Sequence, residues 1–83
     1  MTIAISGTPL RINKSRLRVT CVGGTSLIEV NQDNTGWVKV NGGNVVDGVI
    51  AANSLFITDT IGSDDGSTLV RFTGAGTVSF KEI

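Results

Sequence analysis

The residue types that carry most enzymatic chemistry are scarce in this chain. It has no histidine and no tyrosine, and its single cysteine is Cys21. Histidine is the commonest general base and transition-metal ligand, so its absence excludes Ser-His and Cys-His nucleophile systems within one chain. Cys21 lies in the alternating apolar run RLRVTCV, which predicts a buried structural thiol. The sequence therefore predicts a protein that is not an enzyme and uses no cofactor.

Two segments contain aspartates whose carboxylates could bind a metal ion. The stretch NQDNTG, residues 31–36, resembles the first half of a calcium loop, but Gly42 stands where such a loop places its bidentate glutamate. A plain β-turn is the favoured prediction for this stretch. The segment DTIGSDDGS carries Asp59, Asp64 and Asp65, which could join oxygen ligands from another loop around Ca²⁺ or Mg²⁺. We expect a solvated loop there and no metal.

The formal net charge is zero, yet the cations and acids are separated along the chain. Four cations precede the first acidic residue: Arg11, Lys14, Arg16 and Arg18. Small β-barrels can bind single-stranded nucleic acid with such cations and stacking aromatic rings, but the three phenylalanines are predicted to be core residues. We therefore expect this basic segment either to contact an acidic protein surface or to be a solvated face. The acidic loop 59–65 is the candidate complementary surface.

The elements that position these residues are predicted to be strands. No segment shows sustained helical periodicity, and short β-branched runs alternate with glycine- and asparagine-rich turns. The chain predicts one all-β domain over residues 1–83, a small antiparallel β-sandwich or barrel of about seven to nine short strands. The expected strands are 2–6, 10–12, 16–22, 26–31, 37–40, 44–50, 54–58, 69–73 and 77–83.

Glycine-containing turns are predicted to join neighbouring strands as hairpins. The three clearest are Gly23-Gly24, Asn41-Gly42 and Gly74-Ala75-Gly76, of which Asn-Gly is the strongest hairpin dipeptide. The segment 54–58, SLFIT, is apolar on both faces, which predicts a central strand.

The strand WVKV is predicted to have one core face and one outer face. Period-two alternation puts Val38 and Val40 on one side and Trp37 and Lys39 on the other. If the valines face the core, Trp37 faces outward, where tryptophan is a typical interface anchor. If the sheet is covered on that side as well, Trp37 is a core residue, and both interpretations remain open.

The size and the N-terminus limit the setting in which the protein works. A chain of 83 residues has a marginal core, so it gains stability from a partner surface when disulfides are absent. The start MTIAISG lacks the positive region and long apolar run of a signal peptide, and no stretch approaches a membrane span. We expect a protein made in the cytoplasm and not secreted.

The overall character resembles small virion proteins of tailed bacteriophages, capsid decoration (cement) proteins in particular. The features that carry this resemblance are the short chain beginning MTIAISG, the lack of histidine, and hairpin-like segments such as VNGGNVVDG and FTGAGTVSF. The resemblance implies a β-rich module, often trimeric, that clamps neighbouring capsid subunits in the virion. It rests on no diagnostic motif, so it transfers no family residues.

The sequence thus predicts a structural binding module that self-associates, with trimers favoured, and that stabilises a larger assembly. Its expected partners are the major capsid protein or other virion subunits. One alternative is a phage tail, fibre or adhesion module that contacts glycans, and another is a small cytoplasmic inhibitor or nucleic-acid-binding β-barrel. The candidate interface residues are Trp37, Lys39, Arg11, Lys14, Arg16, Arg18, Asp64 and Asp65.

Overall fold

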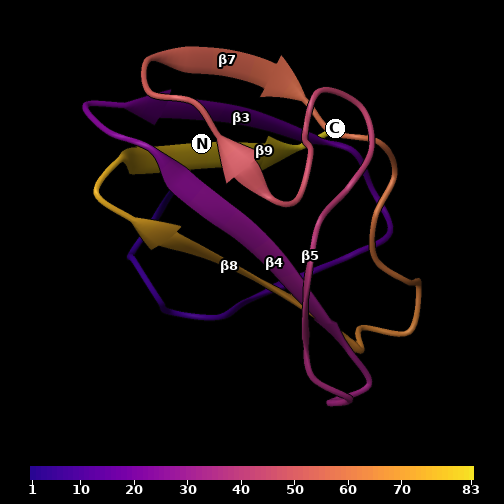
Figure 1. The fold of residues 1–83 in the computed structure, drawn as a ribbon. Helices are drawn as coiled ribbons and strands as arrows, with labels where there is room; N and C mark the ends of the chain where they lie inside the picture. The colour runs from indigo at the N-terminus through magenta and orange to yellow at the C-terminus, as the bar shows by residue number, and fades with distance from the viewer.

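A computed structural model describes all of residues 1–83 and contains nine strands and no helix (Figure 1). The strands are β1 (Thr2–Ala4), β2 (Leu10–Ile12), β3 (Leu17–Val22), β4 (Ser26–Gln32), β5 (Trp37–Lys39), β6 (Val49–Ile50), β7 (Ser54–Ile57), β8 (Thr68–Gly74) and β9 (Thr77–Glu82). Sheet A has the order β1-β9-β3-β7, and sheet B has the order β2-β8-β4-β5, with β6 also paired to β4. The prediction of a small antiparallel all-β sandwich is confirmed.

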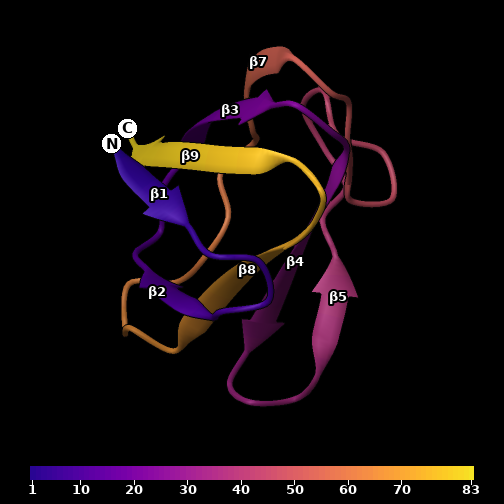
Figure 2. The same cartoon turned by 90° about the vertical axis from the view of Figure 1, so that its left-hand side faces the viewer.

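Two segments of the chain, β3 followed by β4 and β8 followed by β9, each pass from one sheet to the other. Strands β3 and β9 pair in sheet A, and their neighbours in sequence, β4 and β8, pair in sheet B. One antiparallel ribbon therefore runs through both sheets and bends where β3 meets β4 and β8 meets β9 (Figure 2). The hairpins predicted at Gly23-Gly24 and at 74–76 are wrong, because these glycines form a corner at which strands change sheets.

The corner needs glycine because two backbones touch there. A Cβ on Gly76 would lie 2.4 Å from the carbonyl oxygen of Gly24 and 2.6 Å from Cys21 Sγ, inside van der Waals contact. The Cys21 thiol donates a hydrogen bond to the same Gly24 oxygen at 3.1 Å, and Gly76 N donates to Thr25 O at 3.1 Å. Cys21 is buried, as predicted, and its hydrogen bond to Gly24 links the two sides of the bend.

Strand β5 forms its hairpin with β4, across the polar turn NQDNTG. Asp33 and Asn34 adopt left-handed φ angles of 55° and 58° in this turn, a conformation that Asn and Asp tolerate better than most residues. The turn predicted at Asn41-Gly42 is present one residue later, as a reciprocal bridge between Gly42 and Val45, but the strands on either side of it, β5 and β6, pair with β4 and not with each other. After β5 the chain leaves the sheet at Val40 and returns at Gly48, where Gly48 N donates to Val40 O at 2.8 Å. We call residues 40–48 the excursion loop; beyond it, β6 continues along β4.

The core lies between the two sheets and is closed by this loop. Its twelve buried residues are Ile12, Leu17, Val19, Cys21, Ile28, Val40, Val45, Ile50, Val70, Phe72, Val78 and Phe80. The rings of Phe72 from sheet B and Phe80 from sheet A have centroids 5.4 Å apart. The prediction that the phenylalanines are core residues is confirmed for Phe72 and Phe80, and Phe56 is partly buried against the same core.

Two predictions of burial are wrong, and both concern edge strands. Val38 shares a face with buried neighbours, but it is 63% exposed because β5 is the outermost strand of sheet B. Strand β7 is the edge of sheet A rather than a central strand, and Leu55 is 69% exposed. Pro9, which lacks an amide donor, directly precedes β2 at the other edge of sheet B, as expected for proline.

Candidate binding surface on sheet A

The outer face of sheet A combines aliphatic side chains with cations. Alternation on β3 buries Leu17, Val19 and Cys21, so the residues between them point away from the core. Register aligns Lys81, Arg18 and Ile57 in one row across the sheet and Ile3, Ser79, Thr20 and Leu55 in the next. We define the A face as these residues: Ile3, Arg16, Arg18, Val22, Leu55, Ile57 and Lys81.

The cations of the A face have no acidic partner in the chain. The protein's one salt bridge joins Arg71 Nε to Glu29 Oε1 at 3.1 Å, on sheet B. Arg16, Arg18 and Lys81 therefore have no carboxylate oxygen within 4.0 Å. These three unpaired cations gather on one face although the whole chain is neutral.

Two carboxylates that are close in sequence to this face, Glu82 and Asp59, have contacts elsewhere in the chain. Glu82, at the end of β9, accepts hydrogen bonds from Asn13 N at 2.7 Å and from Ser15 Oγ at 3.3 Å. Asp59, just beyond β7, packs against the excursion loop, where a Cβ on Gly42 would lie 2.5 Å from Asp59 Oδ2. The A face is therefore available to an anionic group from outside the chain.

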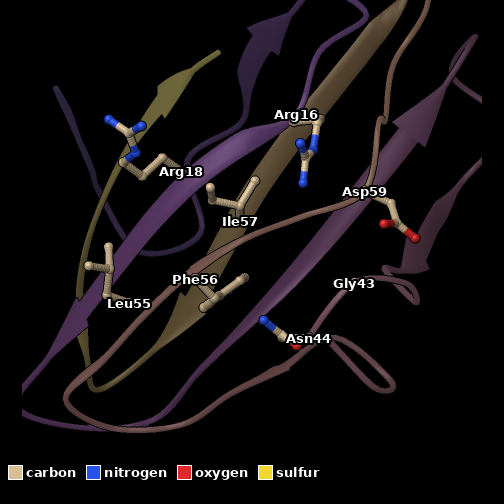
Figure 3. Close-up of a pocket in the computed structure, with 8 residues that line it drawn as sticks. All are labelled: Arg16, Arg18, Gly43, Asn44, Leu55, Phe56, Ile57 and Asp59. Atoms are coloured by element: carbon tan, nitrogen blue, oxygen red, sulfur yellow. The ribbon is translucent and has the colours of Figure 1, made fainter.

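A pocket of about 450 Å³ opens at the β7 margin of this face (Figure 3). Arg16 and Arg18 form one side, and Gly43 and Asn44 of the excursion loop lie across from them. The residues that line it are Arg16, Arg18, Gly43, Asn44, Leu55, Phe56, Ile57 and Asp59. The pocket thus offers an aliphatic surface beside two guanidinium groups.

Arg16 is held in place at this pocket. Its Nε donates to Thr58 O at 3.2 Å, while the Thr58 hydroxyl accepts from Leu17 N at 3.0 Å. Thr58 is fully buried, so it fixes the start of β3 against the end of β7. One guanidinium nitrogen is used in this way, and the other two keep their donors for a ligand.

The predicted basic segment is divided between the two sheets. Arg16 and Arg18 lie together on sheet A, whereas Arg11 lies on β2 of sheet B and donates to Gly66 O, one residue past the predicted acidic loop. Lys14 is exposed in the connection between the sheets. The prediction of one basic surface from 11 to 18 is therefore wrong, and Arg11 instead contacts the backbone at the end of the acidic loop of the same chain.

The acidic loop is organised around one carboxylate. Asp65 Oδ1 accepts from Ser63 Oγ at 2.6 Å, from Ser67 Oγ at 2.5 Å and from Ser67 N at 3.0 Å. The hydrogen bonds from Ser63 and then Ser67 lower the pKa of Asp65 to about 2. Asp64 is exposed and lies beside it in the same turn. No group of three or more histidine, cysteine, aspartate or glutamate side chains gathers at a metal-binding distance.

Trp37 and Lys39 lie on the outer face of sheet B, away from the A face. The Trp37 ring is half-buried, and the Arg71 guanidinium carbon lies 4.1 Å from its centroid. The same Arg71 forms the salt bridge with Glu29, which is level with the exposed Lys39 across β4 and β5. Trp37 therefore lies on the outer face of sheet B, which is one of the two interpretations left open by the sequence, and a neighbouring side chain covers one face of its ring.

Sequence reasoning missed Lys81 and Ile3 as members of this surface. The outward position of Lys81 could have been predicted from the alternation of TVSFKE, because Lys81 follows the inward residues Val78 and Phe80 at the opposite phase. That Lys81 and Arg18 share a row depends on the pairing of β3 with β9, which the sequence does not display.

Comparison of the chain with protein-family models, curated proteins and solved structures finds no match in any of the three. Among its secondary-structure elements there is no helix that is long and apolar enough to cross a membrane.

Proposed function

We propose that this protein is a structural binding module of a virion, which self-associates and docks onto a larger assembly as a capsid decoration protein does. The observation that carries the proposal is the A face, where three unpaired cations alternate with exposed aliphatic side chains. Exposed apolar groups bordered by charge are typical of protein interaction sites. The proposed partners are the major capsid protein or other virion subunits, and the proposed self-association is trimeric.

The proposed mechanism is geometric rather than chemical. Desolvation of Ile3, Val22 and Leu55 supplies most of the affinity, and the cations steer and orient the encounter. Copies that self-associate bind a repetitive surface multivalently, so weak individual contacts add up to stable attachment. The two-sheet core is small, and a partner surface would add to its stability.

Sedimentation velocity tests this proposal. The protein is measured alone over a range of concentrations, and then after mixing with capsids assembled from the major capsid protein of the genome that encodes it. The expected result is an oligomer of about three copies that co-sediments with the capsids. A stable monomer that joins no particle would overturn the proposal.

A pair of surface variants tests whether the capsid contacts the A face. Leu55→Ser removes an exposed aliphatic group without touching the core and is expected to weaken co-sedimentation. Val46→Ser is its matched control, because Val46 is similarly exposed but lies on the excursion loop. Equal loss with both variants would contradict the assignment of the A face.

A further inference from the structure

The pocket beside β7 includes an open strand edge. Thr58 N donates to Leu17 O at 2.9 Å, which fixes the phase of the antiparallel ladder between β3 and β7. By the alternation of such ladders, Phe56 and Ser54 direct their backbone groups to β3, whereas Leu55 directs its N–H and C=O away from the sheet. Strand edges of this kind pair with extended peptides.

The excursion loop limits how much of this edge is open. A Cβ on Gly43 would lie 3.1 Å from Ile57 O, so the turn at Gly43 covers the edge at Ile57. Leu55 lies further along β7 and is 69% exposed. Backbone pairing is therefore restricted to a short stretch near Leu55, and side chains must supply the rest of the recognition.

We infer that this pocket binds an extended acidic segment of the partner protein, with a carboxylate at Arg16 and Arg18 and an aliphatic side chain on Leu55. The inference rests on the proposed function, because it names the part of the partner that the A face receives. Charge complementarity selects the acid, since neither guanidinium has a carboxylate partner within the chain. The exposed Leu55 side chain favours an aliphatic residue near that acid in the partner segment, because contact between the two side chains removes apolar surface from water.

Register sets the spacing of the two partner residues. Leu55 and Ile57 point to the same side of β7, and Arg18 is level with Ile57 on the neighbouring strand. An extended segment carries side chains on one face roughly 7 Å apart, at every second residue. A segment that seats its aliphatic residue on Leu55 therefore brings an acidic residue two positions away to the guanidinium groups.

The surface favours a protein segment over nucleic acid. Stacking of bases needs exposed aromatic rings, whereas the A face has none and Phe56 packs against the core. The floor of the pocket is aliphatic, and Asp59 stands at one end of it, where it would repel a continuous phosphate backbone. An extended acidic peptide needs only one or two carboxylates at fixed places.

The test is a titration of the isotopically labelled full chain with a short capped peptide, followed by amide chemical shifts. The peptide is glutamate-threonine-leucine-threonine-glutamate, which places an acid two residues from the leucine in either chain direction. The expected shifts centre on Arg18, Asn44 and Leu55. Replacing both glutamates by glutamine is expected to weaken binding about tenfold, the scale of one charge-assisted hydrogen bond.

Protein variants provide the second arm of the test. Arg18→Gln is expected to reduce affinity for the acidic peptide to that of the glutamine peptide, whereas Lys39→Gln, a change at an exposed cation on sheet B, leaves it unchanged. Dispersed spectra of both variants establish that they are folded. Equal binding of the two peptides, no binding of either peptide, shifts centred away from β7, or tighter binding of oligothymidylate at the same site would each overturn the inference.

The capsid assay separates this inference from the proposed function. If the chain self-associates and joins capsids while the acidic peptide shows no binding at β7, the inference fails and the proposed function stands. If the peptide binds as expected and the chain remains a monomer that joins no capsid, the pocket assignment stands and the proposed function fails.

Discussion

Phe72 and Leu55 are both large apolar residues on strands, and they are predicted to respond very differently to truncation. Phe72 is 2% exposed and stacks on Phe80 between the two sheets, whereas Leu55 is 69% exposed on the edge strand β7. Phe72→Ala removes a ring that links the sheets and leaves a cavity. Leu55→Ala removes atoms that are already in contact with water.

The expected magnitudes follow from burial. A domain of 83 residues has a free energy of unfolding of roughly 4–12 kcal/mol. Phe72→Ala is expected to lower it by about 3–5 kcal/mol, which is a quarter or more of the total. At roughly 4–8 °C per kcal/mol for a domain of this size, the melting temperature falls by about 12–40 °C. Leu55→Ala is expected to change the free energy by no more than about 0.5 kcal/mol.

Urea denaturation followed by circular dichroism measures both variants, at several protein concentrations. A loss of more than about 2 kcal/mol for Leu55→Ala that is independent of concentration would show that β7 is buried within the protomer, and it would refute the assignment of β7 as an edge. A loss that is present at high protein concentration and disappears on dilution below the dissociation constant of the proposed oligomer instead places Leu55 in an interface between copies.

Three further perturbations test the corner, the acidic loop and sheet B. Gly76→Ala is expected to destabilise the protein by about 1–3 kcal/mol in thermal unfolding, because the new Cβ meets a backbone carbonyl oxygen at 2.4 Å; a neutral effect would contradict the corner geometry. The pKa of Asp65 is lowered from 3.8 to about 2, so the contribution of this carboxylate to stability is complete above pH 3.8 and is lost as pH falls through 2. An NMR titration midpoint near 3.8 for Asp65, or unchanged hydrogen exchange of the Ser67 amide in Asp65→Asn, would contradict the hydrogen bonds from Ser63 and Ser67 to this carboxylate. Trp37→Ala is expected to cost about 1–2 kcal/mol through lost packing and the lost contact with Arg71, and to leave the proposed oligomer intact. Dissociation without destabilisation would make Trp37 an interface anchor instead.

Local alternation made the strands and several of their faces predictable. The inward positions of Leu17, Val19 and Cys21 follow from a period of two, which is a property of any extended chain. The turn NQDNTG was predictable for the same local reason, since Asn and Asp stabilise turns through their own backbone. Burial of Cys21 and of the phenylalanine rings of β8 and β9 needed only hydrophobicity and this alternation.

The sequence could not predict which strands pair. Asn41-Gly42 and the glycines at 74–76 have the composition of hairpin turns, yet one lies in the excursion loop and the other lies in a corner. A glycine-rich link permits a tight reversal and a bend between sheets equally well, because both require the same freedom in φ. Contacts between segments distant in the chain decide between them, such as the approach of Gly76 to Gly24.

Composition and alternation are enough to predict a small all-β protein without histidine chemistry, with cations gathered toward its N-terminal half. The placement of Arg16 and Arg18 beside Lys81 and the open edge of β7, and of Arg11 against Gly66 at the end of the acidic loop, follows from the folded structure. The physical reason is that periodicity is local and sets which way a side chain points. Position on a shared surface depends on long-range register, which forms only when the ribbon bends and both sheets close over one core.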